Sequence, residues 1–271
     1  MKPKREFDPA EQVDVIIRFI QEYFAENGNP NTKAVIGISG GKDSTIAAAL
    51  LVRALGPDRV IGVLMPESVQ KDIDDSRKVC KILGIQSFEI NIGPACEKLY
   101  KNFQNDTCGE LMVNTQMRTN TPARIRMATL YMVAAAVGGR VCNTGNASEA
   151  FIGYTTKYGD LAGDFALFTE LTVREIYAIG DYLLELPDEL VHKAPTDGMS
   201  GKTDEDNTGI PYNAIDDFLL EGKHPSMEVY EKMISAYKRN THKQCINLPH
   251  PYRTLGGLHR VNACYEDAWS F

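Results

Sequence analysis

Short apolar runs alternate with amphipathic segments of helical length through the first half of the chain. Strands separated by helices of about 10 to 15 residues favour parallel pairing, and parallel strands need helices on both faces of their sheet. The sequence therefore predicts an α/β fold with a doubly wound, mostly parallel sheet and helices on both faces. The expected strands are 34–38, 60–65, 88–92 and 141–144, and the expected helices are 13–24, 44–55, 72–83 and 122–137, with another helix after the third strand.

The second half of the chain follows a different pattern. Residues 143–164 are polar and glycine-rich without clear periodicity, and helical spacing returns over 172–186, 213–220 and 227–239. The segment 197–209 holds three glycines and almost no apolar side chain, so we expect a mobile loop that works as a lid. The alternative is a solvated surface connection with no catalytic part. We expect one domain over residues 1–271, with a nucleotide-binding core at about 34–144 and a loop-rich, helical substrate and lid part at about 145–271.

Charge and apolar content exclude several classes of protein. The 29 basic and 36 acidic residues give a net charge of −7, which disfavours a nucleic-acid partner. The longest wholly apolar run has eight residues, from Leu130 to Val137, far short of the roughly 18 needed to span a bilayer. The first residues lack the apolar core of a secretory signal, so we expect a cytoplasmic protein with no membrane partner.

The cysteine spacing argues against a metal or redox motif. Six cysteines are present, and no two of them form a CxxC pair. This spacing disfavours a zinc ribbon, an iron-sulfur cluster and a thioredoxin-type redox pair. We expect reduced thiols that mostly pack as small apolar side chains.

The sharpest local signal is a glycine loop, SGGKDS at residues 39–44, between an expected strand and an expected helix. Backbone N–H groups freed by the glycines and by the helix N-terminus favour an anion, and a phosphate is the natural ligand. A Walker A loop needs Gly where this chain has Ile36, and Ser or Thr where it has Asp43. The dinucleotide fingerprint fails as well, because Ser39 and Lys42 occupy glycine positions. The alternative is a helix cap in which Asp43 and Ser44 only satisfy terminal N–H groups.

The loop resembles the SGGxDS loop of the ATP pyrophosphatases, which split ATP into AMP and pyrophosphate. The resemblance implies the adenine nucleotide alpha hydrolase-like fold. It also implies that Ser39, Ser44 and the glycine amides hold the β and γ phosphates, that Lys42 offsets their charge, and that Asp43 holds magnesium. The implied ATP contacts within the loop are Gly37, Ile38, Ser39, Gly40, Gly41, Lys42, Asp43 and Ser44.

A series of downstream motifs narrows the resemblance to one family. The motifs are NTPARIRM at 120–127, TGNASEAFIGYTTKYGD at 144–160, KAPT at 193–196, TDEDNTGIPYNAIDDFLLEG at 203–222 and THK at 241–243. Together with the loop, this series resembles the ammonia-dependent NAD+ synthetases from about Ala34 to Lys243. In that family ATP adenylates the nicotinate carboxylate of deamido-NAD+, and ammonia then displaces AMP to give NAD+.

The resemblance also assigns individual residues. It implies that Thr144 and Thr196 contact ATP, that Glu149 joins Asp43 on Mg2+, and that Lys42, Asp43 and Glu149 are catalytic. The implied contacts to deamido-NAD+ are Arg124, Lys157, Asp164, His242 and Lys243. Taken singly, Glu149 and Arg124 also fit ordinary surface ions, and His242 beside Lys243 fits a basic helix end.

Two stretches depart from the family pattern. Many members carry a lysine that contacts ATP where this chain has Val173, and the neighbouring Arg174 is the candidate substitute. The family's Gly-Thr-Asp-His-Ala-Ala-Glu is here Asn143-Thr144-Gly145-Asn146-Ala147-Ser148-Glu149, so the intervening Asp and His are absent. The roles of that Asp and His cannot be transferred to this chain.

The resemblance implies a homodimer with deamido-NAD+ near the subunit interface. Only some 33 residues precede Ala34, so we expect no glutaminase segment there, and ammonia comes either free or from a separate donor. Two alternatives stay open at this point. One is another ATP-pyrophosphatase-type ligase that acts on a different nucleotide or on tRNA, and the other is a non-catalytic ATP-binding module.

Overall fold

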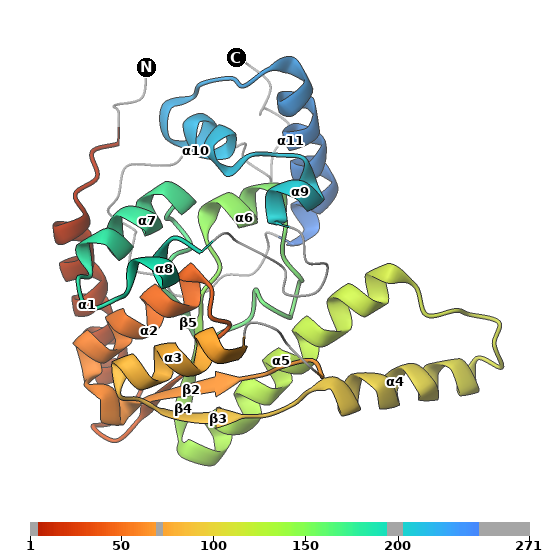
Figure 1. Cartoon of the computed structure of the whole chain (residues 1–271), viewed down its shortest axis with the longest axis horizontal. Coiled ribbons are helices and arrows are strands. Elements are labelled where there is room, and N and C mark those ends of the chain that lie inside the picture. The colour runs from red at the N-terminus through yellow and green to blue at the C-terminus, as the bar shows by residue number, and fades with distance from the viewer. Residues whose placement is uncertain (1–4, 69–72, 194–202, 244–271) are drawn as a thin grey trace.

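The computed structural model describes residues 5–68, 73–193 and 203–243, and it is built on a five-stranded sheet (Figure 1). The strand order is β3-β2-β1-β4-β5, and every neighbouring pair is parallel. The doubly wound parallel sheet expected from the sequence is therefore confirmed. The strands are β1 (Lys33–Gly37), β2 (Val60–Leu64), β3 (Gln86–Glu89), β4 (Gly139–Asn143) and β5 (Phe165–Ala166).

Helices cover both faces of the sheet, as the alternating pattern requires. In β1, Ala34 and Ile36 pack into one buried cluster, whereas Val35 packs into the cluster on the opposite face. The first cluster lies under α1 (Pro9–Glu26), α2 (Lys42–Leu55), α3 (Ile73–Leu83) and α7 (Val173–Tyr182). The second lies under α4 (Gly93–Asp106) and α5 (Thr115–Val137).

A third apolar cluster holds the second half of the chain together. It joins three helices, α6 (Ala147–Ile152), α10 (Tyr212–Glu221) and α11 (Met227–Asn240). Phe151 of α6 packs against Phe218 of α10 and Tyr237 of α11, with ring centroids 5.7 and 5.1 Å apart. These helices lie above the carboxyl ends of the strands in Figure 1. The limits proposed for the single domain and its two parts stay a prediction.

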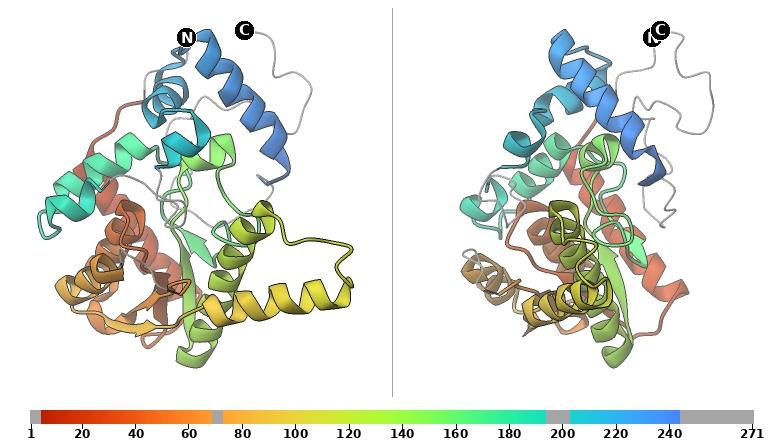
Figure 2. Two further views of the ribbon diagram at one scale, coloured as in Figure 1. Left: turned by 45° about the vertical axis from the view of Figure 1, so that its right-hand side comes forward. Right: turned by 90° about the vertical axis from the view of Figure 1, so that its right-hand side faces the viewer.

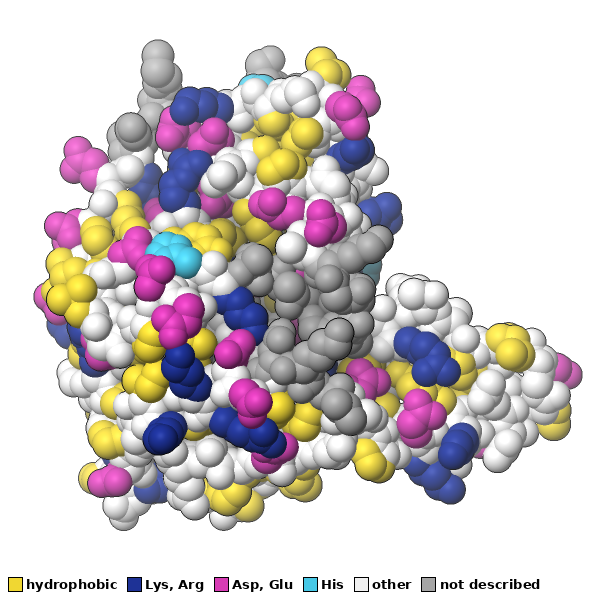
Figure 3. Space-filling view, viewed as in Figure 1, with side chains coloured by type: hydrophobic (Ala, Val, Ile, Leu, Met, Phe, Trp, Pro, Cys, Tyr) yellow, Lys and Arg dark blue, Asp and Glu magenta, His cyan; other side chains and the backbone are white. Residues whose placement is uncertain are grey.

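The connection between α4 and α5 forms an arm. The two helices run outward from the body, and a loop at residues 107–114 joins them (Figures 1 and 2). Leu99, Leu111 and Met112 on this arm are 47%, 57% and 68% exposed. Figure 3 shows hydrophobic side chains spread over the arm. The arm thus offers apolar surface outside the core.

The structure corrects several boundaries. Helix α5 begins at Thr115 because Asn114 caps it, seven residues before the expected start at Pro122. The stretch expected as one helix over 172–186 ends at Tyr182, and a short helix α8 (Asp188–Val191) follows after Pro187. Strand β5 and helix α6 were not predicted, since two and six residues are too short to show a period.

The expected lid is only partly described. Residues 203–208 form a capped helical turn, in which Thr203 accepts a hydrogen bond from Asp206 N ahead of α9 (Asp204–Thr208). The expectation of a loop without secondary structure was therefore wrong for this part. Residues 197–202 and Thr196 lie outside the described residues.

Two further expectations concern the whole chain. No helix among the described residues is long and apolar enough to cross a membrane. Of the cysteines that the structure describes, Cys80, Cys96 and Cys142 are buried and Cys108 is exposed, and all four are free. Cys245 and Cys264 lie outside the described part.

Candidate active site

The candidate site lies where the winding of the sheet reverses. Strands β1 and β4 are neighbours, but the chain leaves β1 toward β2 and β3 before it returns to β4. Ligands of open α/β sheets bind outside the carboxyl ends of the strands at such a point. The glycine loop directly follows β1, and Thr144 directly follows β4. The topology therefore brings these two sequence motifs to one edge of the sheet.

The two serines of the loop hold its shape through hydrogen bonds to each other. Ser39 Oγ lies 3.0 Å from Ser44 Oγ, and Ser39 N donates to Ser44 Oγ at 3.2 Å. Ser44 Oγ donates to the carbonyl of Gly41 at 3.1 Å. The N-cap of α2 is Gly41, whose missing side chain leaves the N–H groups of the first helical turn open to a ligand. The loop is thus folded as an anion cradle.

Gly40 sits where only glycine fits. Its φ of +78° lies in the left-handed region, which side chains with a Cβ rarely adopt. A Cβ on Gly40 would also lie 3.0 Å from Asp75 Cβ and 3.1 Å from Ser76 N of α3. The close approach of α3 therefore leaves no room for a side chain at this point of the loop.

Lys42 and Asp43 form an ion pair in the first turn of α2. Lys42 Nζ lies 2.7 Å from Asp43 Oδ2, and the Lys42 side chain is only 2% exposed. Burial alone would lower the pKa of the Lys42 amine, but the carboxylates of Asp43 and Glu149 outweigh burial and raise it. Lys42 is therefore a permanent positive charge at the loop.

Glu149 lies within electrostatic reach of this pair. It is the third residue of α6, and its Oε2 accepts a hydrogen bond from Asn146 N while Asn146 Oδ1 accepts one from Glu149 N. Burial and the negative charge of Asp43 raise the pKa of Glu149 to about 8, against the opposing effect of Lys42. Two carboxylates thus converge on one buried cation.

The two carboxylates fit a magnesium ion. Asp43 Oδ1 is buried and has no hydrogen-bond partner among the residues that the structure describes. Carboxylate oxygens are the ligands that Mg2+ prefers, and a divalent cation would relieve the repulsion that raises the pKa of Glu149. Asp43 and Glu149 are therefore the residues that would hold the metal.

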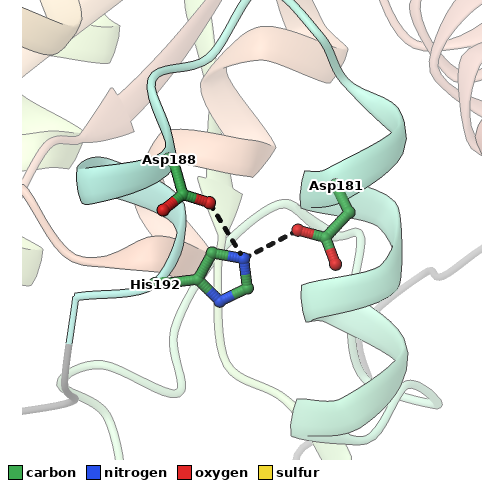
Figure 4. A group of neighbouring side chains, drawn as sticks. All are labelled: Asp181, Asp188 and His192. Atoms are coloured by element: carbon green, nitrogen blue, oxygen red, sulfur yellow. Dashed lines mark hydrogen bonds and ion pairs between the residues drawn. The ribbon is translucent and has the colours of Figure 1, made fainter.

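An aromatic ring connects Lys42 to the surface. The Lys42 amine lies 5.7 Å from the ring centroid of Tyr177, and the His192 ring stacks on Tyr177 at 5.3 Å with an interplanar angle of 6°. Figure 4 shows His192 between Asp181 of α7 and Asp188 of α8, at 2.7 and 3.5 Å from its Nε2. These contacts hold α8 and α7 together beside the loop.

A second, basic part of the site lies between α5, the 153–162 loop and the end of α11. It is a cavity of about 250 Å³ that brings together four of the residues expected to contact the substrate, Arg124, Lys157, His242 and Lys243. The other lining residues were not predicted from the sequence, and they are Gln116, Asn120, Thr156, Arg239 and Asn240. Arg239 was detectable, because it lies one helical turn before His242.

Basic side chains fix the loop that lines this cavity. Lys157 Nζ donates to the carbonyl of His242 at 2.7 Å, and Arg124 Nε donates to the carbonyl of Lys157 at 3.2 Å. Lys243 Nζ donates to the carbonyls of Gly153 and Thr155 at 2.8 and 2.7 Å. Burial lowers the pKa of Lys243 despite the nearby carboxylate of Asp160. The cavity therefore concentrates positive charge.

Asp160 connects the two parts of the site. Its carboxylate accepts a hydrogen bond from Thr156 N at 2.6 Å and so closes the loop. The same carboxylate acts on the pKa of both Glu149 and Lys243. Asp160 therefore lies close enough to act electrostatically both on the candidate metal-binding residue Glu149 and on Lys243 of the basic cavity.

Some predicted residues lie apart from these groups. Asp164 Oδ2 accepts a hydrogen bond from Val141 N at 2.7 Å, so this carboxylate extends the pairing of β4 and does not line the basic cavity. Arg174 lies 2.5 Å from Asp217 and 3.8 Å from Glu221. Because these carboxylates engage its guanidinium, Arg174 is not placed as a substitute for the family's lysine.

The fold and the loop define an ATP pyrophosphatase-type protein, with the nucleotide site at the carboxyl edge of a parallel sheet. The family model described as NAD synthase matches residues 12–248. The chain belongs to this family.

Several relatives resemble most of the chain. The NH3-dependent NAD+ synthetase of Pyrococcus horikoshii is 39% identical over 76% of this chain and 77% of its own length. That of Alkaliphilus metalliredigens is 38% identical over 85% of this chain and 96% of its own length.

Solved structures resemble the chain as well. The NMN synthetase of Francisella tularensis gives a TM-score of 0.81 at 32% identity and covers 90% of this chain and 98% of that one. The NAD+ synthetase of Burkholderia pseudomallei gives a TM-score of 0.71 at 29% identity. The match covers 89% of this chain and 92% of that one.

Proposed function

We propose that the chain is an ammonia-dependent NAD+ synthetase, a ligase that uses ATP to amidate deamido-NAD+ with ammonia. The products are NAD+, AMP and pyrophosphate. One observation carries the proposal: the fold holds both a phosphate loop with Lys42, Asp43 and Glu149 grouped at it and a basic cavity that includes four of the residues expected to contact deamido-NAD+. The family membership supports the same reaction. A tRNA-directed ligase and a non-catalytic ATP-binding module are not favoured.

The chemistry requires cations because two anions must meet. The nicotinate carboxylate attacks the α-phosphorus of ATP, an acyl-adenylate forms and pyrophosphate leaves. The loop N–H groups and Lys42 hold the β and γ phosphates, and basic side chains of the cavity hold the substrate phosphates. Mg2+, when bound by Asp43 and Glu149, neutralises the charge that develops on the leaving pyrophosphate.

The second step needs no nucleophile from the protein. Ammonia attacks the adenylated carbonyl, the carbon–oxygen bond to AMP breaks, and the ammonium that forms loses a proton as the amide appears. The protein contributes position and charge to this step, and the adenylate requires protection from water. We also infer that the reaction takes place in the cytoplasm, with ammonia either free or delivered by a separate donor.

One assay tests the proposal. The protein is incubated with ATP, Mg2+, ammonium and deamido-NAD+, and the nucleotide products are separated. We expect AMP and pyrophosphate to form in a one-to-one ratio with NAD+. Stoichiometric ADP would contradict the reaction, and ATP turnover with no NAD+ would point to a different acceptor.

A second candidate substrate is the nicotinate mononucleotide. The Francisella NMN synthetase gives a TM-score of 0.81, against 0.71 and 0.68 for two NAD+ synthetases, so its fold is the more similar one. Amidation of the mononucleotide uses the same carboxylate chemistry. The ratio of kcat/KM for deamido-NAD+ to kcat/KM for nicotinate mononucleotide separates the candidates, and a ratio below one would reassign the substrate.

We further infer a homodimer. The arm of α4 and α5 carries the exposed side chains of Leu99, Leu111 and Met112, and clustered apolar surface of this kind is typical of protein interfaces. Light scattering after gel filtration measures the mass. We expect twice the 30.1 kDa of one chain, and Leu111→Glu with Met112→Glu should give the monomer. A wild-type monomer would contradict the inference.

A further inference from the structure

Ser148 and Asp216 meet at a buried point where three helices converge. Ser148 belongs to α6 and Asp216 to α10, and their side chains are 0% and 1% exposed. Ser148 Oγ donates to Asp216 Oδ1 at 2.6 Å. This is a short hydrogen bond to a carboxylate, the stronger kind of hydrogen bond in proteins.

The same two side chains also hold the start of α7. Ser148 Oγ accepts a hydrogen bond from Val173 N at 3.1 Å, and Asp216 Oδ2 accepts one from Arg174 N at 2.8 Å. Val173 and Arg174 are the first two residues of α7, whose N–H groups have no partner within the helix. The pair therefore fixes the positions of α6, α7 and α10 relative to one another.

Burying the carboxylate of Asp216 at such a position costs desolvation free energy. Burial raises its pKa, and the hydrogen bonds from Ser148 and Arg174 N oppose that shift. The guanidinium of Arg174 pairs with Asp217 at 2.5 Å, and the positive charges of Arg174 and Lys42 also oppose the rise in the pKa of Asp216. Apolar residues would pack the same three helices with no charge to desolvate. This carboxylate therefore calls for a role beyond packing.

The residue next to Ser148 is the metal-binding candidate Glu149. Helix α6 has only six residues, and Phe151 in its second half packs against Phe218 of α10 and Tyr237 of α11. Asn146 N already occupies Glu149 Oε2 and leaves Oε1 without a hydrogen bond among the described residues. The direction of Glu149 thus depends on how the first turn of α6 is held, and Ser148 is the polar side chain that ties this turn to α10.

We propose that Asp216, acting through Ser148, is a positioning residue that keeps Glu149 facing Asp43 so that both carboxylates share one divalent cation. The inference rests on the proposed function for the identity of that cation. Asn146 and Ser148 hold Glu149 here from two sides.

The test measures metal binding without turnover. Mn2+ is titrated into the full-length protein in the presence of α,β-methylene-ATP, and free Mn2+ is followed by electron paramagnetic resonance. Loss of a group that orients a metal ligand weakens affinity by about 10- to 100-fold. We expect weakening in this range for Ser148→Ala and Asp216→Asn. The matched control is Asp217→Asn, whose neighbouring but more exposed carboxylate should leave Mn2+ affinity within twofold.

Kinetics and folding complete the test. Both variants should need more Mg2+ for half-maximal activity and lose kcat, while KM for deamido-NAD+ at saturating Mg2+ stays within twofold. If Asp216→Asn does not fold by circular dichroism, Ser148→Ala decides alone. Unchanged Mn2+ affinity in folded Ser148→Ala overturns the inference. Wild-type protein that binds Mn2+ but makes no amide overturns the proposed function instead, and the comparison of Mn2+ affinities still stands.

Discussion

Lys42 Nζ lies 2.7 Å from Asp43 Oδ2, so two sequence neighbours in the first turn of α2 pair with each other beside the phosphate loop. A complex of a triphosphate with a divalent cation offers each partner a stronger counter-charge, a phosphate for Lys42 and the cation for Asp43. We therefore expect that binding of such a complex separates the ion pair.

Removing any one of the three charges on Lys42, Asp43 and Glu149 should impair catalysis more than folding. Asp43→Asn, Glu149→Gln and Lys42→Met should each lower kcat by about 100-fold, the scale of losing one preorganised charge-stabilising group. The release of pyrophosphate measures the effect. Lys78→Met on the exposed face of α3 is the control and should keep normal activity. Near-normal turnover in Asp43→Asn would remove that carboxylate from the site.

Gly40→Ala should abolish ATP binding, whereas Gly56→Ala should not. Both glycines have φ near +80°, so both substitutions strain the backbone by about 1 to 3 kcal/mol. A new Cβ at Gly40 also meets Asp75 and Ser76, while one at Gly56 meets nothing within 4 Å. Calorimetric titration with ATP and Mg2+, next to thermal melts, separates the two effects. Equal ATP affinity in both variants would show that α3 does not shape the loop.

The fold was predictable where the pattern was long and periodic. The sheet and its covering helices follow from apolar runs such as 34–38, which is buried on both faces. Short elements were not predictable, because the six residues of α6 are held by the capping box of Asn146 and Glu149 and by contacts with α10 and α11. Tertiary packing, which a local pattern does not contain, creates such elements.

The residues of the phosphate loop were predictable from the sequence, whereas those that line the basic cavity were less so. Residues 39–44 lie together in sequence, so their chemistry is visible as one motif. Gln116 reaches the basic cavity only because α5 and α11 converge there, and no sequence motif contains it. For Asp164 the family resemblance implied substrate contact, which stays a prediction, and the structure shows that its carboxylate accepts a hydrogen bond from Val141 N.

Arg239 should contribute to substrate binding. It lines the basic cavity with Arg124, Lys157 and Lys243, and loss of a charge-assisted contact weakens binding by about 10-fold or more. Arg239→Gln should therefore raise KM for deamido-NAD+ and leave KM for ATP unchanged. Lys232→Gln, on the same helix but paired with Glu228 at the surface, is the control. An equal rise of both KM values in Arg239→Gln would indicate general damage.

The metal-free protein should lose stability as pH rises, and Glu149 should be the cause. Burial and the charge of Asp43 raise the pKa of Glu149 from its ordinary 4.5 to about 8. An acid with a higher pKa in the folded state binds more protons when folded than when unfolded. The free energy of unfolding therefore falls with pH between the two pKa values, here from about 4.5 to about 8.

Thermal melts in EDTA at pH 5, 6, 7 and 8 measure this dependence. Glu149→Gln keeps an acceptor for Asn146 N but cannot ionise, so its melting temperature should fall less over this range than that of the wild type. Saturating Mg2+ should oppose the fall of the wild-type melting temperature with pH. The cation favours the ionised carboxylate, so it stabilises the wild type more at pH 8 than at pH 5. Parallel curves for the two proteins in EDTA would show that Glu149 is already ionised in the metal-free fold.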